Sequence, residues 1–207
     1  SAERVPLLEA ASWDVHRDLA PAWGIDAELT LVPQGTPPPP RSWWLHLDDD
    51  LKASDGVLAY HGVNAEGLPM ARVGVRTSEQ SGMRWTLAAS HTLLQLLANP
   101  RGNEAVMVGD RVIPQEICRP CYGPRWAYEI DGVLVSDFLL PAWFDNYRTL
   151  GDARFDYGGH IREPFQVLPG AYAFIHEKAT PLAVHAERHP VRLVRAAKRP
   201  QSRRRDR

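Results

Sequence analysis

The side chains best suited to chemistry lie on one predicted helix, Ala88–Pro100, which reads A-A-S-H-T-L-L-Q-L-L-A-N-P. Ser90 is a residue type that caps a helix or begins a turn, and no glycine or proline interrupts the run before its last residue. At about 100° per residue, four polar side chains share one arc about 100° wide. They are His91, Thr92, Gln95 and Asn99. Leucines fill most of the remaining circumference, which predicts a helix buried on most sides with one polar stripe.

A polar stripe on a buried helix faces a cleft, a water site or a hydrogen-bonding partner. The imidazole of His91 is of a type that binds metals and transfers protons. It is equally the side chain of a core histidine whose neighbouring amides satisfy its hydrogen bonds. The helix alone leaves both interpretations open.

Further segments match, in order, the pattern of a known family. They are R-D-L-A-P-A-W-G-I-D-A (Arg17–Ala27), A-Y-H (Ala59–His61), E-I-C (Glu116–Cys118), D-G-V-L-V-S-D-F-L-L-P-A-W-F (Asp131–Phe144) and L-P-G-A-Y (Leu168–Tyr172). Over roughly Val15–Phe174 the chain resembles a family of uncharacterised bacterial zincin-like metallopeptidase relatives, whose helix carries S-H-E-L-x-E-x-x-x-D-P. The resemblance implies a zincin-like domain in which the strand Met70–Arg76 lines a substrate cleft.

The departures from the family pattern fall on its acidic positions. In a zincin the histidine binds zinc, the adjacent glutamate is the general base, and further ligands come from the same helix or just after it. This chain keeps the histidine but replaces the acids by Thr92, Gln95, Asn99 and, after E-I-C, Arg119. Amides are poor zinc ligands, and loss of a general base alone costs on the order of 10²–10⁴ in rate.

The resemblance therefore implies a degenerate site without a cofactor. Its residues are His91, Thr92, Gln95, Asn99, Glu116 and Arg119. We expect a pseudo-metallopeptidase that serves as a non-catalytic binding or structural module, for instance as a subunit of a larger assembly such as a phage particle. The alternative is an active zinc peptidase with rearranged ligands, in which His91 acts with His61, Glu116 or His160 and Glu116 supplies the base.

Length and composition favour one globular domain. The chain has 207 residues, 44% of them hydrophobic, and no run of 18 apolar residues, so we expect no membrane span. Its first residues lack the charged-then-apolar pattern of a signal peptide. Cys118 and Cys121 form one C-R-P-C without the second pair that a zinc ribbon requires, which favours free thiols in a turn. These features favour a cytoplasmic protein, or a virion protein if the gene belongs to a phage.

Charge is distributed unevenly along the chain. From residue 188 onward there are nine basic residues and one acidic residue, against 15 basic and 24 acidic residues before it. The last part predicts an electrostatic arm for an acidic partner protein or, without sequence preference, for nucleic acid. Its partner-binding candidates are Arg195, Lys198, Arg199, Arg203, Arg204, Arg205 and Arg207.

Hydrophobic periodicity predicts the remaining elements. A helix is expected over Val5–Ala20, ended by Pro21, and loops over Thr77–Gly82 and Arg154–Ile161. Strands are expected at Ala27–Val32, Trp43–Leu47, Gly56–His61, Ala71–Val75, Phe165–Leu168 and Ala171–Ile175, with hairpins around Gly109-Asp110 and Asp131-Gly132. Strands scattered among a few helices predict an α+β fold, with one mixed sheet packed on the central buried helix. The expected boundaries are residues 1–178 for the domain and 179–207 for the basic tail.

Overall fold

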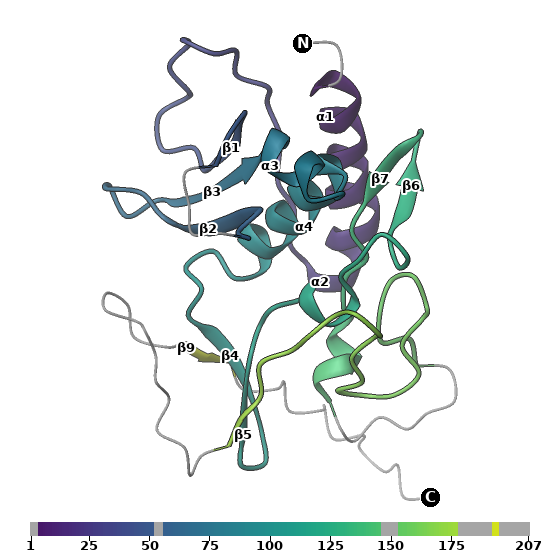
Figure 1. Cartoon of the computed structure of the whole chain (residues 1–207). Coiled ribbons are helices and arrows are strands. Elements are labelled where there is room, and N and C mark those ends of the chain that lie inside the picture. The colour runs from purple at the N-terminus through teal and green to yellow at the C-terminus, as the bar shows by residue number, and fades with distance from the viewer. Residues whose placement is uncertain (1–3, 52–55, 146–152, 178–191, 195–207) are drawn as a thin grey trace, which may run out of the picture.

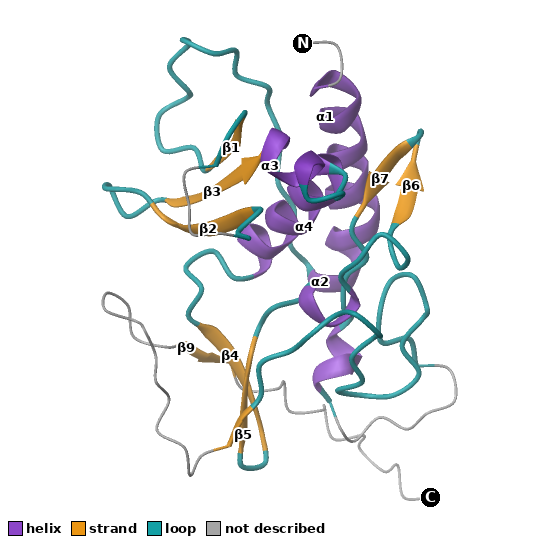
Figure 2. Ribbon diagram, in the orientation of Figure 1, coloured by secondary structure: helices purple, strands orange, loops and turns teal. Residues whose placement is uncertain are grey.

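The computed structural model describes residues 4–51, 56–145, 153–177 and 192–194, and it has the predicted α+β architecture (Figure 1, Figure 2). Its helices include α1 (Arg4–Trp13), α2 (Ala20–Trp23), α3 (Val75–Gln80) and α4 (Trp85–Ala98). Its strands include β1 (Trp44–Asp48), β2 (Ala59–Val63), β3 (Pro69–Gly74), β4 (Glu104–Val108), β5 (Arg111–Pro114), β6 (Tyr128–Ile130), β7 (Val133–Val135), β8 (His176–Glu177) and β9 (Arg192–Val194).

Helix α4 occupies the centre of the molecule. It packs against β1, β2 and β3 on one side and against β7 on another, and Figure 1 shows it between these two groups of strands. Leu87 and Leu94 on this helix are fully buried. The helix ends at Ala98, and its C-cap residue Asn99 leaves the helical conformation with φ −141° and ψ 70°, because it precedes Pro100. The predicted central buried helix is therefore confirmed.

Helix α4 nevertheless begins earlier than the sequence indicated. Its first residue is Trp85, so Ser90 lies inside the helix and caps nothing. The Ser90 hydroxyl instead accepts a 2.7 Å hydrogen bond from the backbone N–H of Ser136 and donates to the carbonyl of Leu87 at 3.2 Å. This serine ties the chain that follows β7 to the central helix.

The N-terminal helix extends beyond Pro21, contrary to the prediction. After α1 the chain is π-helical over Asp14–Leu19 and then continues as α2. Pro21 lies in the first turn of α2, where a missing N–H costs no hydrogen bond. The helix ends instead at Gly24, which adopts the left-handed conformation with φ 67°.

The strands form three small sheets among the described residues, and not the one mixed sheet that was expected. In the first, β3 pairs in parallel with β1 and antiparallel with β2. In the second, β5 pairs with β4 and β8, and β4 also pairs with β9. In the third, β6 pairs with β7. Helices α3 and α4 intervene between β3 and β4, which separates the first sheet from the second.

Both predicted hairpins are confirmed. The β4–β5 pair turns at Gly109-Asp110, and the β6–β7 pair turns at Asp131-Gly132. In the second turn both residues have positive φ, 48° and 78°. A two-residue turn of this kind matches the twist of the flanking strands, which explains why the sequence signal was reliable.

Other predicted strands are absent from the described residues. Ala27–Val32 and Phe165–Leu168 carry no strand pairing, and Ala171–Ile175 is extended but unpaired. In Ala27–Val32 and Ala171–Ile175, alternate side chains pack against the hydrophobic core, so half-burial produces the alternation without a sheet, whereas in the remaining segment Phe165 and Leu168 pack on it. The expected loop Thr77–Gly82 is helical up to Gln80, because α3 follows β3 directly.

The arginine-rich end of the predicted tail lies outside the described residues. Within the expected tail, β9 pairs in parallel with β4. No helix in the described part of the chain is long and apolar enough to cross a membrane.

Candidate functional site

His91 lies on α4 with its imidazole against the ring of Tyr122, at a centroid distance of 4.3 Å. The Nδ1 atom is buried and has no hydrogen-bond partner among the described residues. Burial, helped by the positive charge of Arg119, lowers the pKa of His91 to about 3. The imidazole is therefore neutral at physiological pH, the form that can bind a metal.

The other polar residues of the helix stripe make hydrogen bonds within the fold. Thr92 donates its hydroxyl to the carbonyl of Ala88 at 2.7 Å, inside the helix. Gln95 Nε2 donates to the carbonyl of Gln115 at 2.9 Å, and Gln115 Nε2 donates to the carbonyl of Ala98 at 2.8 Å. Two amides thus join α4 to the chain that follows β5.

The side chain of Asn99 makes two hydrogen bonds with the backbone of Glu104, the first residue of β4. Its Oδ1 accepts from the N–H of Glu104 at 3.0 Å, and its Nδ2 donates to the carbonyl of the same residue at 3.2 Å. An amide makes both bonds at once, whereas a carboxylate only accepts. The neutral residues at these positions therefore have structural partners that an acid does not satisfy.

Glu116 and Arg119 form an ion pair, with Oε2 and Nε 2.7 Å apart. The Arg119 guanidinium also lies over the rings of Tyr172 and Phe174, with its central carbon 5.0 and 5.6 Å from the ring centroids. It donates a hydrogen bond to the hydroxyl of Tyr172 as well. The charge of this arginine is therefore fixed in place from several sides.

His61 of β2 belongs to the same region. Burial lowers its pKa, and the charge of Arg119 lowers it further, as it does for His91. The Nε2 atom of His61 is buried without a hydrogen-bond partner among the described residues. Burial raises the pKa of Glu116 even though Arg119 opposes this effect. The structure thus brings together two imidazoles, one carboxyl group and one guanidinium, as the sequence suggested.

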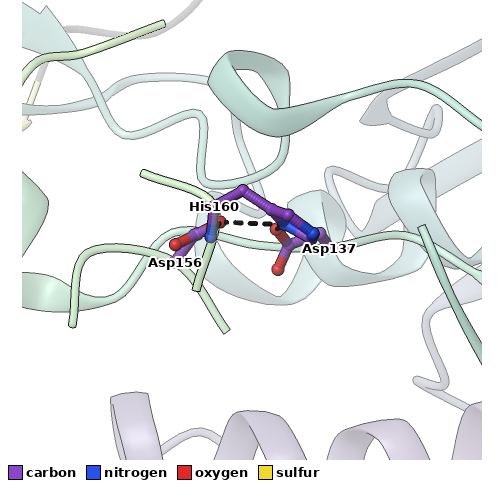
Figure 3. A group of neighbouring side chains, drawn as sticks. All are labelled: Asp137, Asp156 and His160. Carbon is purple, nitrogen blue, oxygen red and sulfur yellow. Dashed lines mark hydrogen bonds and ion pairs between the residues drawn. The ribbon is translucent and has the colours of Figure 1, made fainter. Parts of the chain in front are cut away.

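His160 does not join this group. It lies instead beside two aspartates, and its Nδ1 is 3.4 Å from Asp137 Oδ2 and 3.4 Å from Asp156 Oδ2 (Figure 3). In the described part of the chain, these three side chains are the group of potential metal ligands whose ligating atoms lie within 4.8 Å of one another. Of these three residues, sequence analysis named only His160, as an alternative ligand beside His91, and it did not recognise Asp137 or Asp156.

A third polar cluster joins the N-terminal helix to the loops. The Tyr128 hydroxyl lies 2.8 Å from Asp14 Oδ1 and 3.1 Å from Asp18 Oδ2. The Tyr157 hydroxyl donates to Asp18 Oδ1 at 2.7 Å, and Arg17 pairs with the same carboxylate. Burial raises the pKa of Asp14 to about 7. Sequence analysis missed this cluster, because the partners lie more than 100 residues apart.

Cys118 and Cys121 are free, as predicted for this pair, and both are buried. Burial raises the pKa of both thiols well above the ordinary value, which leaves them protonated and poorly nucleophilic. They contribute packing to the core around α4.

Comparison of the chain with protein-family models, curated proteins and solved structures finds no match. The zincin-like resemblance stays a prediction.

Proposed function

We propose that this protein is a non-catalytic binding module built on a degenerate zincin-like site. The observation that carries the proposal is the position of Arg119, whose charge acts on both His61 and His91. A fixed guanidinium beside two imidazoles repels a divalent cation, and it supplies the positive charge that a metal ion would otherwise supply there. Thr92 hydrogen-bonds inside its own helix and supplies no general base.

The surface beside Arg119 supports a binding role. Tyr172 and Phe174 are exposed to 48% and 47%, and their rings pack edge to face at 5.6 Å. They project from the extended, unpaired segment Ala171–Ile175, whose Ala171 and Ala173 pack on the core. Exposed aromatic side chains next to an arginine are typical of protein-binding surfaces. The proposed ligand is therefore a protein partner, consistent with membership of a larger assembly.

A second candidate function is an active zinc peptidase that uses His61, His91 and Glu116. What favours it is that His61 Nε2, His91 Nδ1 and Gln95 Oε1 are buried without hydrogen-bond partners in the described part of the chain. Two imidazoles and a carboxylate make a known catalytic zinc set. One observation opposes this function. His61, His91 and Glu116 are not among the described groups whose ligating atoms lie within 4.8 Å of one another.

The deciding experiment measures zinc at this site and peptidase activity together. Wild type and the His61→Ala and His91→Ala variants are stripped with a chelator, re-equilibrated with zinc and assayed on an unstructured protein substrate. We expect no proteolysis and no change in bound zinc between the three proteins. One zinc per chain that is lost in both variants, accompanied by proteolysis in wild type alone, would establish the peptidase instead.

The binding surface is tested separately by capture of partners from the native host. The Tyr172→Ala/Phe174→Ala double variant should lose a partner that wild type retains. The matched control is Trp43→Ala, because Trp43 is similarly exposed at 45% but lies just before β1. The basic arm after residue 194 is a second proposed contact, and its contribution should weaken as salt is raised.

A further inference from the structure

The cluster of Asp137, Asp156 and His160 joins two segments that are distant in sequence. Asp137 follows β7, whereas Asp156 and His160 belong to the loop after residue 152. The two segments meet through a bridge between Leu139 and Asp156. Figure 3 shows both carboxylates turned toward the imidazole. Both aspartate side chains are fully buried, while the His160 side chain is 35% exposed.

The separations within the cluster fit shared ligands better than direct hydrogen bonds. Both contacts of His160 Nδ1 with aspartate oxygens are 3.4 Å long. A charge-assisted hydrogen bond between such groups is usually about 2.7–2.9 Å long. Two ligand atoms bound tetrahedrally at about 2.0–2.1 Å from a zinc ion lie about 3.3–3.4 Å apart. Each carboxylate is thus spaced from the imidazole as two ligands of one ion are, and the three ligating atoms all lie within 4.8 Å of one another.

Backbone donors orient the carboxylates for this arrangement. Asp137 Oδ1 accepts N–H bonds from Phe138 and Gly158, both at 2.8 Å, which leaves Oδ2 facing His160. Asp156 accepts from the N–H of His160 at 2.9 Å and from that of Ile161 at 3.0 Å. Outer hydrogen bonds of this kind hold metal ligands in position.

Gly158 keeps the space between the ligands open. A Cβ atom at this position would lie 2.6 Å from His160 Nδ1 and 2.9 Å from Asp137 Oδ2. Any larger residue therefore displaces the imidazole or the carboxylate. The requirement for glycine here comes from the close approach of His160 and Asp137.

The two carboxylates of the cluster need a shared proton or a bound cation. Two buried carboxylates side by side cannot both ionise without a proton or a cation between them. Among the described residues, the ion-pair partner of both aspartates is His160. An ion bound by two carboxylates and one imidazole would balance this charge, and the exposed edge of His160 provides a way in.

We propose that Asp137, Asp156 and His160 bind one divalent transition-metal ion of the zinc or manganese class, with water completing its coordination on the exposed side. Imidazole with carboxylates suits both ions. The ion would tie the chain after β7 to the loop that carries His160. This proposal is independent of the proposed function, because none of its ligands belongs to the group around Arg119.

The test measures binding of Zn²⁺ and of Mn²⁺ to the full-length protein after a chelator has removed bound metal. Calorimetry gives the affinity and stoichiometry, and thermal melting gives the change in stability. We expect one equivalent of at least one of the two ions and a higher melting temperature when it is bound. Asp137→Asn should weaken binding by more than about tenfold, and His160→Gln should do the same. The asparagine can still accept both backbone N–H bonds, so this variant is expected to fold.

His91→Ala and His16→Ala are the matched controls, and neither should change the affinity. His16 pairs with Asp26 on the surface and reports adventitious binding there. Absence of binding of both ions to folded wild type would overturn the proposal. So would an affinity that is unchanged in both Asp137→Asn and His160→Gln. Loss of binding in His91→Ala alone would place the ion at α4 and would refute the proposed function as well.

Discussion

Arg119 Nε lies 2.7 Å from Glu116 Oε2, and the same guanidinium influences the imidazoles of two other segments, at His61 and His91. One arginine therefore supplies the positive charge that acts on both imidazoles. In the zincin-like pattern that we propose the chain resembles, this position is an aspartate, so the arginine reverses the sign of a charge.

Replacing Arg119 by glutamine should raise the pKa of both His61 and His91, because a nearby positive charge disfavours the imidazolium form. It should also destabilise the fold by about 1–3 kcal/mol, because the half-buried Glu116 loses its partner. Histidine NMR titration and urea unfolding measure the two effects. The control is Arg76→Gln, which removes an exposed ion pair with Asp50. Unchanged histidine pKa values would contradict the assigned role of Arg119.

The central helix allows a paired test of burial. Leu94 is fully buried, so Leu94→Ala should destabilise by about 2–5 kcal/mol. Leu97 is only partly buried in the same core, so Leu97→Ala should cost less. Urea unfolding of the two variants gives the difference. Equal losses would indicate that α4 is oriented differently about its axis.

The sequence predicted those features that depend on neighbouring residues. The hairpin at Asp131-Gly132 follows from local turn chemistry, and the burial of α4 follows from its leucine periodicity. These two signals required no knowledge of how distant segments pack. The grouping of His91 with Glu116 and Arg119, in contrast, came only from the resemblance to the zincin-like family.

Features that arise from tertiary packing were missed. Asp137 and Asp156 meet because the chain after β7 runs antiparallel to the loop that carries Asp156, and nothing in either local sequence marks that pairing. The segment Ala171–Ile175 has a strand-like pattern, yet it finds no ladder partner and packs on the core as an extended chain. The alternation of apolar and polar residues indicates only which side chains are half-buried. A strand also requires a neighbouring segment whose backbone N–H and C=O groups are free to pair.

Restoring an acid on α4 should destabilise the protein and not create a site by itself. In Gln95→Glu, the carboxylate cannot donate to the carbonyl of Gln115, which loses this hydrogen bond in a buried position. The expected cost is about 1–3 kcal/mol. Gln95→Met, which removes the donor without adding a charge, is the control and should cost less. Thermal melting of both variants checks the order, and a more stable glutamate variant would contradict it.

The cluster at the N-terminal helix should make stability depend on pH through Asp14. Burial and the charge of Asp18 raise the pKa of this carboxyl group, the Tyr128 hydrogen bond and Arg17 lower it, and the net pKa is about 7. In the unfolded chain an aspartate has a pKa of about 3.9. Between these values the folded state binds more protons than the unfolded state. The free energy of unfolding should therefore fall as the pH rises from about 4 to about 7 and then level off.

Asp14→Asn should remove this dependence. The amide oxygen can still accept the hydrogen bond from Tyr128, while the ionisable group is gone, so the variant should be more stable than wild type at pH 8. The gain should be on the order of a few kcal/mol at most, and it should disappear as the pH approaches 4. Urea unfolding at pH 4.5, 6 and 8 measures it, with Glu9→Gln on the exposed face of the same helix as the control. Parallel pH profiles for wild type and Asp14→Asn would show that the buried carboxyl group is not the group that titrates on folding.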